Sequence, residues 1–363
     1  MSLVSFVFAA VLMLAAGLEQ TLVDTGSVDN VVVLRGAAET EVSSSIERDA
    51  ASVIVSQPEV VHNATGDPVA SKETLVLVTL PKKLSLAPMN VIVRGIGSHS
   101  NEMRPQVRIV SGRAPIPGLH EVMVGSNIAD KFEGGALGGK IQLALIDWDV
   151  VGIFDAGKTA FSSEIWADND QVMSAFRRNS YSVVIMKVDG TENFNSIKAR
   201  LVSDPRLSVQ VKREIEFYRD QSEIMAKFIR ILGLAMTVFF SVGAILGAMV
   251  TMYTAVANRT REIGALRALG FSKANILLAF LTESVTLGLV GGLAGLLAGS
   301  ALQFITISTM NWETFSELAF GFTLTRQIAL QTILFALGMG LTGGFLPAWR
   351  ASRLKIVDAL RET

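Results

Sequence analysis

Apolar residues gather into four long runs, separated by segments of ordinary mixed composition. The runs cover residues 2–18, 231–258, 274–312 and 327–349, and within the third only Glu283 carries a charge. A helix needs about 20 apolar residues to cross the hydrocarbon core of a bilayer. A buried helix of a soluble protein could imitate one such run but not four. The pattern therefore predicts a membrane protein with four transmembrane helices.

The first run admits a second interpretation, as a secretory signal peptide. It is short, and Ala15, Ala16 and Gly17 form a passable cleavage site. A signal peptide normally opens with basic residues, and only Met1 and Ser2 precede the apolar residues here. We therefore expect a retained anchor. One explanation for its short lead-in is that the true start of the protein lies upstream.

The short loops between the runs predict an orientation, because loops rich in Lys and Arg stay in the cytoplasm. The link after the second run and the tail after the fourth are basic, whereas the link after the third contains two acids before its first basic residue. The residues concerned are Arg259, Arg261, Arg267 and Lys273 with the single acid Glu262; Arg350, Arg353, Lys355 and Arg361 with the acids Asp358 and Glu362; and Glu313 and Glu317 before Arg326. The second-to-third link and both chain ends are then cytoplasmic. The large segment between the first two runs is extracytoplasmic.

That extracytoplasmic segment reads as a mixed α+β domain. Predicted strands cover 30–34, 74–79, 91–93, 106–110, 141–145, 149–154 and 182–188. Predicted helices cover 44–55, 168–178 and 192–202. The expected fold is thus a membrane protein of four transmembrane helices, with an α+β extracytoplasmic domain inserted between helices 1 and 2.

A single long helix is predicted to join this domain to the membrane. From about Glu214 the helical pattern continues through Lys227 and Arg230 into the second run, with no Pro or Gly before Gly233. Such a stalk would link the outer domain mechanically to the cytoplasmic loop. The expected divisions are transmembrane helix 1 at 1–20, the extracytoplasmic domain at 21–213, and the stalk with the remaining membrane helices at 214–363.

Composition excludes several kinds of binding site and chemistry. Only 18% of the 363 residues are charged, the net charge is −1, and there is no cysteine. The charge offers no field for nucleic acid, and the lack of cysteine excludes disulfides and thiolate metal sites. The three histidines lie far apart in sequence, so a histidine metal site is not expected. No convergent set of acids, bases or nucleophiles suggests an enzyme.

One glycine-rich segment imitates a phosphate-binding loop. Residues 134–140 fit the Gly-x-x-x-x-Gly-Lys pattern, but Ile141 stands where Ser or Thr should bind magnesium. A strand rather than a helix is predicted to follow, so no helix N-terminus would receive the phosphate. We interpret the segment as a glycine turn before a β-hairpin.

Within the apolar runs, small residues recur at intervals of four. Such spacing lets helix backbones approach closely in lipid, either within one chain or between two copies. Both alternatives stay open for Gly243, Gly247, Gly291, Gly295, Gly299, Gly340 and Gly344. Glu283 is an acid inside a predicted span and is therefore a functional candidate. It lies near the cytoplasmic end, where it could instead snorkel or cap the adjoining link.

The link 258–273 is predicted to contain a short amphipathic helix. Ile263, Leu266 and Gly270 share one face of it. Gly270 suits the left-handed residue that ends a helix, and Ser272 suits the N-cap of the next. Such a helix could bind anionic headgroups or fit a groove on a partner protein.

These segments together resemble the FtsX/MacB superfamily of ABC transporter permeases. The cytoplasmic link Arg261–Gly270, followed by Glu283 and Gly291-Gly292, is similar to its permease signature. The tail 347–353 ending in 359–361 resembles its C-terminal motif, although Lys355-Ile356 stands where proline is common. The outer domain, with 138–141 leading to 151–154, is similar to the MacB-like periplasmic core. The family usually has a cytoplasmic helix before the first span, which this sequence lacks.

The resemblance implies a non-catalytic permease subunit of the cytoplasmic (inner) membrane. It would form a dimer, most simply of two identical copies, and dock onto a separate ABC ATPase that binds ATP and magnesium, with no cofactor in this chain. A periplasmic adaptor and an outer-membrane channel could complete an efflux path. The ATPase-coupling residues implied are Arg259, Arg261, Glu262, Ile263, Leu266, Arg267, Ala268, Leu269 and Gly270.

Other functions remain open at this level. Within the family, the chain could switch on cell-wall hydrolases in the manner of FtsX, or extract lipoproteins. Outside it, a membrane-anchored sensor without an ATPase fits the same hydrophobic pattern. The sequence does not identify the cargo.

Overall fold

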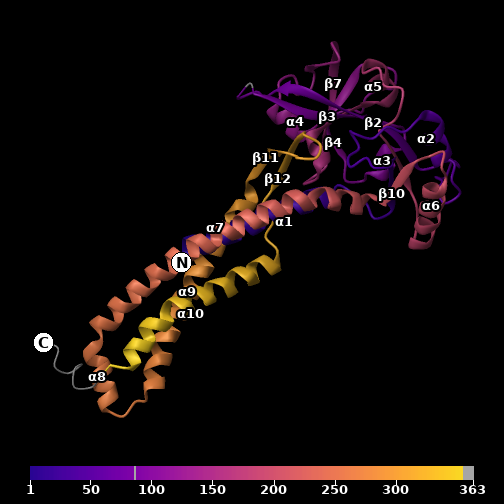
Figure 1. Cartoon of the computed structure of the whole chain (residues 1–363). Coiled ribbons are helices and arrows are strands. Elements are labelled where there is room, and N and C mark those ends of the chain that lie inside the picture. Colours follow the sequence, from indigo (N-terminus) through magenta and orange to yellow (C-terminus); the bar gives the residue numbers. More distant parts are fainter. Residues whose placement is uncertain (86, 355–363) are drawn as a thin grey trace. The chain divides into compact units, whose positions relative to one another are not determined.

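The computed structural model describes residues 1–85 and 87–354 (Figure 1). The chain divides into two compact units, which we describe separately. The helical unit comprises Met1–Gly17, Ala226–Ile305 and the described residues from Gly321 onward. The sheet unit comprises Leu18–Met225 and Thr306–Phe320.

Long helices make up the helical unit. Their bounds are α1 (Ser2–Val23), α7 (Glu214–Asn258), α8 (Thr260–Ala268), α9 (Lys273–Ser300, followed by the 3-10 turn Ala301–Phe304) and α10 (Arg326–Ser352). Within the described residues, four helices (α1, α7, α9 with its 3-10 turn, and α10) are long and apolar enough to cross a membrane. Each contains one of the four predicted apolar runs or most of it. Their number and direction of crossing remain predictions.

The third apolar run is not helical to its end. We expected it to continue towards Trp312, but α9 stops at Ser300 and residues Thr306–Met310 form strand β11. This segment reads Thr-Ile-Ser-Thr-Met after Ile305, and β-branched residues favour strands over helices. Hydropathy alone cannot distinguish such a strand from the end of a span.

The prediction of one continuous helix beginning at about Glu214 is confirmed. Helix α7 has 45 residues, from Glu214 to Asn258. At about 1.5 Å per residue it is about 68 Å long. That is more than twice the thickness of a hydrocarbon core, about 30 Å.

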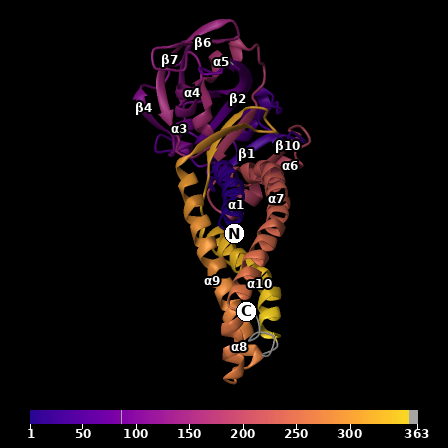
Figure 2. The same ribbon diagram turned by 90° about the vertical axis from the view of Figure 1, so that its left-hand side faces the viewer.

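A ten-stranded mixed sheet is the centre of the sheet unit (Figure 2). Its strands are β1 (Asn30–Arg35), β2 (Ala70–Pro81), β3 (Pro88–Ile96), β4 (Arg108–Gly112), β5 (Glu121–Gly125), β6 (Lys140–Leu143), β7 (Ile146–Asp155), β8 (Glu164–Asp168), β9 (Val183–Lys187) and β10 (Val209–Arg213). The order is β10-β1-β9-β2-β3-β8-β5-β7-β4, and β6 pairs with β7. The pairs β3–β8 and β5–β7 are parallel, and the other described pairs of this sheet are antiparallel.

Two large hydrophobic cores lie along this sheet, besides a smaller cluster that contains Phe161 and Trp166. One packs β1, β9 and β10 against α2 (Arg48–Val55) and α6 (Thr191–Ser203). The other packs β3, β5, β7 and β8 against α4 (Ser126–Lys131) and α5 (Asn169–Ala175). Strands β2 and β3 connect the two halves through a long antiparallel ladder that runs from Thr74–Gly95 to Pro81–Pro88.

All seven predicted strands overlap observed ones, with shifted ends. The segment predicted as a strand over 141–145 ends at Leu143, because Ala144 and Leu145 adopt positive φ values of 52° and 66° and turn the chain into β7. Two such residues form the tight turn that fits a twisted hairpin. The glycine segment before it is a turn, with positive φ at Gly134 and Gly138, and β6 follows it as expected.

A short two-stranded sheet from late in the chain completes the sheet unit. Strands β11 and β12 (Glu317–Gly321) pair with each other. Residues Thr306–Phe320 belong to the sheet unit together with Leu18–Met225. Lys82 Nζ lies 2.7 Å from the carboxylate of Glu317, which is 3% exposed, and Lys131 donates a hydrogen bond to Ser308 Oγ. The sequence analysis did not predict this hairpin.

Candidate functional sites

The first candidate site is the link between α7 and α9, which contains helix α8. Gly270 ends α8 with φ +97°, and its N–H donates to Arg267 O while the N–H of Phe271 donates to Leu266 O. Ser272 caps α9, accepting a hydrogen bond from the N–H of Asn275 at 3.2 Å. These are the helix-ending and helix-starting roles predicted from the sequence.

The apolar residues of the link are divided between the interior and the surface. Ile263 is 2% exposed and packs in a cluster with Met252, Val256, Ile276, Phe280, Ala348 and Ala351. Leu266, which we placed on the same face, is 38% exposed, and Leu269 and Phe271 are 78% and 48% exposed. Burial by α7, α9 and α10 therefore covers Ile263 but leaves three large apolar side chains uncovered.

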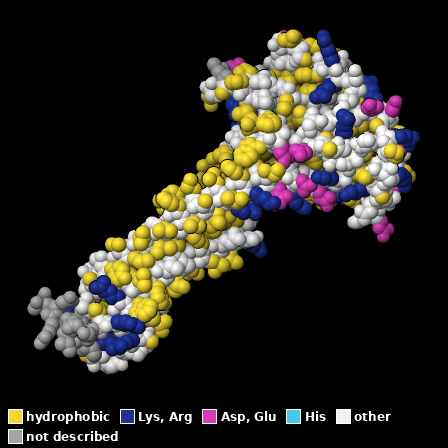
Figure 3. All heavy atoms as spheres, in the orientation of Figure 1, with side chains coloured by type: hydrophobic (Ala, Val, Ile, Leu, Met, Phe, Trp, Pro, Cys, Tyr) yellow, Lys and Arg dark blue, Asp and Glu magenta, His cyan; other side chains and the backbone are white. Residues whose placement is uncertain are grey.

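The charged residues of the link lie at one end of the helical unit (Figure 3). Arg259 Nη1 is 3.1 Å from Glu283 Oε2, so the intramembrane acid predicted from the sequence is paired with the link. Arg267 Nη1 donates to Phe271 O at 3.4 Å. Arg261, Glu262 and Ala268 are exposed on α8. Every predicted coupling residue thus lies on or beside this short helix.

The small residues predicted for helix packing fall into two groups. A methyl group placed at five of them would meet other helices of the same unit within 4 Å: Gly291, Gly295 and Gly299 face α1, while Gly340 and Gly344 face α9. At Gly243 and Gly247 of α7 it would meet nothing within 4 Å in the described chain. Ser284 Oγ of α9 also donates to Gly340 O at 2.7 Å. Packing within one chain therefore explains the first group and not the second.

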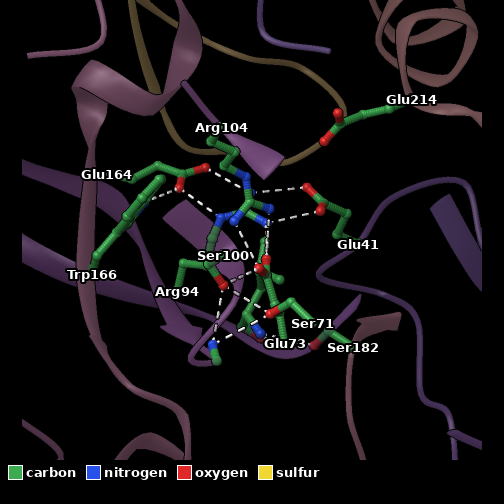
Figure 4. Close-up of polar contacts among 12 residues, drawn as sticks. Glu41, Ser71, Glu73, Arg94, Ser100, Arg104, Glu164, Trp166, Ser182 and Glu214 are labelled. Carbon is green, nitrogen blue, oxygen red and sulfur yellow. Dashed lines mark hydrogen bonds and ion pairs between the residues drawn. The ribbon is translucent and has the colours of Figure 1, made fainter. Parts of the chain in front are cut away.

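The second candidate site lies within the sheet unit and was not found from the sequence. It is a buried ion cluster of Glu41, Glu73, Arg94, Arg104 and Glu164 (Figure 4). Arg94, on β3, is 1% exposed and binds Glu164 of β8 through two hydrogen bonds of 2.7 and 2.8 Å. It also donates to Glu41 at 2.9 and 3.1 Å and to Glu73 at 3.0 Å.

Arg104 forms the other half of the cluster. It donates to both oxygens of Glu73, on β2, at 2.7 and 2.8 Å, and Ser100 Oγ adds a third bond at 3.0 Å. The guanidinium carbon also lies 4.9 Å from the ring centroid of Phe161. Stacking and paired bonding are the contacts that make arginine suitable for buried sites.

Electrostatics within the cluster favour full ionisation. Burial opposes the charge on Glu73, but Arg104 and Arg94 outweigh it and lower the pKa of this carboxyl to about 2. Burial likewise opposes the charge on Arg94, but Glu164 and Glu41 raise its pKa well above the usual value. The described part of the chain contains no group of three or more potential ligands that could hold a metal ion. Fully ionised and internally paired, the cluster is suited to fixing the structure of the sheet unit.

A weak signal for the cluster exists in the sequence. Arg94 interrupts the apolar run Val91-Ile92-Val93, and Glu73 precedes Thr74-Leu75-Val76. A charge inside a strand with apolar neighbours indicates a buried partner. The partners could not be assigned, because Glu41, Glu73, Arg104 and Glu164 lie in separate segments of the chain.

Comparison with known proteins places these features in a family. Residues 2–204 match the model of the MacB-like periplasmic core domain, and residues 234–356 match the FtsX-like permease C-terminal model. The fold and these matches define an ABC transporter permease, a membrane protein with a domain outside the cytoplasm. The chain belongs to the MacB/FtsX type of this class, with the MacB-like periplasmic core domain covering more than half of it.

Several curated relatives are similar to this chain. The uncharacterized ABC transporter permease YknZ of Bacillus subtilis is 30% identical over 205 residues, which are 55% of this chain and 49% of that one. The pyoverdine export ATP-binding/permease protein PvdT of Pseudomonas fluorescens is 30% identical, covering 67% of this chain and 38% of the relative. The macrolide export ATP-binding/permease protein MacB of Neisseria gonorrhoeae is 25% identical, covering 66% and 38%. The chain thus matches half or less of the length of each.

Solved structures of outer domains also match parts of the chain. The extracellular domain of YknZ from Gram-positive bacteria has a TM-score of 0.38 at 16% identity and covers 50% of this chain and 99% of that one. The periplasmic region of MacB from Actinobacillus actinomycetemcomitans has a TM-score of 0.40 at 11% identity and covers 54% and 94%.

Proposed function

We propose that this chain is the permease subunit of an export system, and that it transmits the work of ATP hydrolysis from the cytoplasm to the sheet unit outside. The observation that carries the proposal is α7. It begins among buried residues of the sheet unit and continues without interruption to the link that contains α8. A helix of this length can span the bilayer and still extend beyond it.

The proposed orientation puts the N-terminus, α8 and the C-terminus in the cytoplasm, and the sheet unit outside, in a multi-pass protein of the inner membrane. The basic residues of the α8 link and the acidic character of the α9–α10 connection support it. The grouping of the units agrees with it. The hairpin Thr306–Phe320 clusters with the sheet unit, whereas α8 belongs to the helical unit.

We propose that a separate ABC ATPase, which binds ATP and magnesium, docks on α8. Leu266, Leu269 and Phe271 expose apolar area beside the arginines of the link, as a helix that enters a groove on a partner should. The relatives PvdT and MacB carry ATP-binding and permease functions under one name. By analogy, the present chain supplies the permease part.

A second copy of the chain is proposed to cover α7. Gly243 and Gly247 leave bare backbone on α7, against which nothing in the described chain packs closely, and glycines at this spacing suit close helix contacts in lipid. The export names of the relatives support efflux as the direction of movement. A periplasmic adaptor and an outer-membrane channel would then complete the path.

Purification of the tagged chain from native membranes tests this proposal. We expect an ABC ATPase in equal amount, together with ATP hydrolysis that is lost when α8 is altered. If the purified chain carries no ATP-binding subunit, the proposal fails, and a membrane-anchored sensor becomes the better interpretation.

A further inference from the structure

The first three turns of α7, residues 214–225, are embedded in the sheet unit, and we call this segment the α7 base. One face of it is buried: Glu214, Phe217, Tyr218, Gln221, Ser222 and Met225 are each at most 6% exposed. The opposite face is exposed at Glu216, Arg219 and Asp220. The spacing of three and four residues between buried positions is that of a helix packed along one stripe.

Two polar side chains of the buried face reach fixed partners in the sheet unit. Glu214 Oε2 accepts hydrogen bonds from the N–H of Ser27 at 2.9 Å and from Asn30 Nδ2 at 2.8 Å. One turn later, the hydroxyl of Tyr218 donates to Glu41 Oε2 at 3.3 Å. Glu41 is itself held by Arg94, so the α7 base is tied directly to the buried ion cluster.

The region around the α7 base also has unused bonding capacity. Glu214 Oε1 and Arg104 Nε are buried and have no hydrogen-bond partner in the described chain. Figure 4 shows Glu214 near the cluster, with no bond drawn between it and the labelled cluster residues. A cavity of about 30 Å³, lined among others by Glu41, Tyr218 and Gln221, is large enough for one water molecule.

From these contacts we infer that Glu214 and Tyr218 are positioning residues. They anchor α7 in the sheet unit, so that a movement of the helix carries the sheet unit with it. The inference rests on the proposed function, since it names the point at which that function delivers its movement. A helix held only by apolar contacts can slide or rotate by small side-chain shifts. Two directed hydrogen-bond anchors one turn apart fix both the rotation and the height of the helix.

The anchors imply a direct test on the full chain, without any partner. Hydrogen exchange is measured by mass spectrometry on the chain in lipid nanodiscs. Tyr218→Phe, which removes only one hydroxyl, and Glu214→Ala should each speed exchange of the amides of 214–225 by about ten-fold. Peptides from β2, β3 and β8 should keep their wild-type rates. Glu216→Ala, on the exposed face of the same turn, is the matched control and should change nothing.

Transmission is tested in the complex with the ATPase, with ATP and vanadate as the probe. In the wild type, trapping should change exchange both in α8 and in the sheet unit. In Tyr218→Phe and Glu214→Ala the change in α8 should remain, while the change in the sheet unit should be lost. Glu214→Gln keeps an acceptor oxygen and should, unlike Glu214→Ala, retain the change in the sheet unit.

Each contrary outcome has its own meaning. Wild-type exchange in 214–225 of both variants, or equal acceleration throughout the sheet unit, would show that these residues are not anchors. Full transmission to the sheet unit in both variants would also overturn the inference. If no ATPase co-purifies, the proposed function fails, while the first measurement still decides whether the anchors exist.

Discussion

Arg94 is the residue on which the buried ion cluster depends, since it contacts Glu41, Glu73 and Glu164 at once. Replacing it with methionine would leave the buried carboxylates of Glu41 and Glu164 without this counter-charge, and Glu73 with Arg104 alone. Removing one partner of a buried ion pair typically costs about 3–5 kcal/mol. We expect Arg94→Met to lower the unfolding free energy of the sheet unit by about that amount. Urea unfolding monitored by tryptophan fluorescence measures this change.

The matched control for Arg94→Met is Arg113→Met. Arg113 also pairs with a glutamate, Glu121, at 2.6 Å, but its side chain is 49% exposed. Exposed pairs contribute little to stability. If both variants lose the same unfolding free energy, burial is not the reason why the cluster stabilises the sheet unit.

Glu313, in the loop between β11 and β12, gives the sheet unit a pH dependence near neutrality. Burial, followed by the charges of Glu39 and Asp220, raises the pKa of this carboxyl to about 7, against the opposing effect of Lys212. Because the folded-state pKa lies above the unfolded value, stability should fall as the pH rises from about 4.5 to 7. Glu313→Gln should therefore stabilise the sheet unit at pH 8 by about 1 kcal/mol, allowing for partial exposure, and not at pH 4.5.

Urea unfolding at the two pH values measures this difference. Glu73 has the opposite sign, since its lowered pKa means that its stabilising effect is lost only as the pH falls below about 4.5 towards 2. An equal gain from Glu313→Gln at both pH values would contradict the titration and indicate a packing effect.

At the scale of single residues, the sequence indicated which charged residues were unusual but did not identify most of their ion-pair partners. The pairing of Glu283 with the link was one of the alternatives considered, because both lie within a few turns of the same helix end. The partners of Arg94 could not be found, since no local rule connects Glu41, Arg94 and Glu164 across the turns and strands that separate them.

At the scale of elements, α8 is defined by how it ends. Gly270 has φ +97°, which proline, fixed near −65°, cannot adopt. Gly270→Pro should therefore unwind the last turn of α8, and Arg267→Glu should remove the bond to Phe271 O and reverse the charge. We expect both variants to insert in the membrane normally and to lose at least about ten-fold of ATP-driven transport. Retention of coupled transport by both would refute the role assigned to α8.

The α9–α10 contact should tolerate no large side chain at Gly292. A methyl group there would lie 2.4 Å from Cβ of Ala336. Gly292→Leu should lower the unfolding temperature in detergent, with a cost of about 1–3 kcal/mol. Gly338→Leu in α10 is the control, because a methyl group at Gly338 meets nothing within 4 Å in the described chain. Equal effects would mean that loss of glycine flexibility, not close packing, matters.

Strong local patterns were the ones that predicted elements correctly. α7 and α8 follow from an unbroken helical pattern and from turn-forming residues at Gly270 and Ser272. Strand β8 was missed because its first four residues, 164–167, are all buried. No alternation of polar and apolar residues marks it as a strand. Strand β11 was hidden inside an apolar run for the reason given above, the equal hydropathy of strands and spans.

For the whole molecule, the proposed orientation can be tested by labelling, because the natural chain has no cysteine. Single cysteines at two exposed positions, Lys158 of the sheet unit and Ala274 after the link, would report independently. A membrane-impermeant maleimide added to intact spheroplasts should modify Lys158→Cys and not Ala274→Cys. Labelling of both from outside would refute the orientation, and with it the docking of a cytoplasmic ATPase.

The hairpin of β11 and β12 has a consequence for biosynthesis. The ribosome delivers the strands of the large sheet early, yet Glu317, the partner of Lys82, is translated only after α9. Lys82 and Lys131 therefore lack their partners Glu317 and Ser308 until the segment after α9 has been translated. The sheet unit therefore completes its fold only after α9 has been synthesised, and a chain that stops before β11 leaves Lys82 without the carboxylate of Glu317.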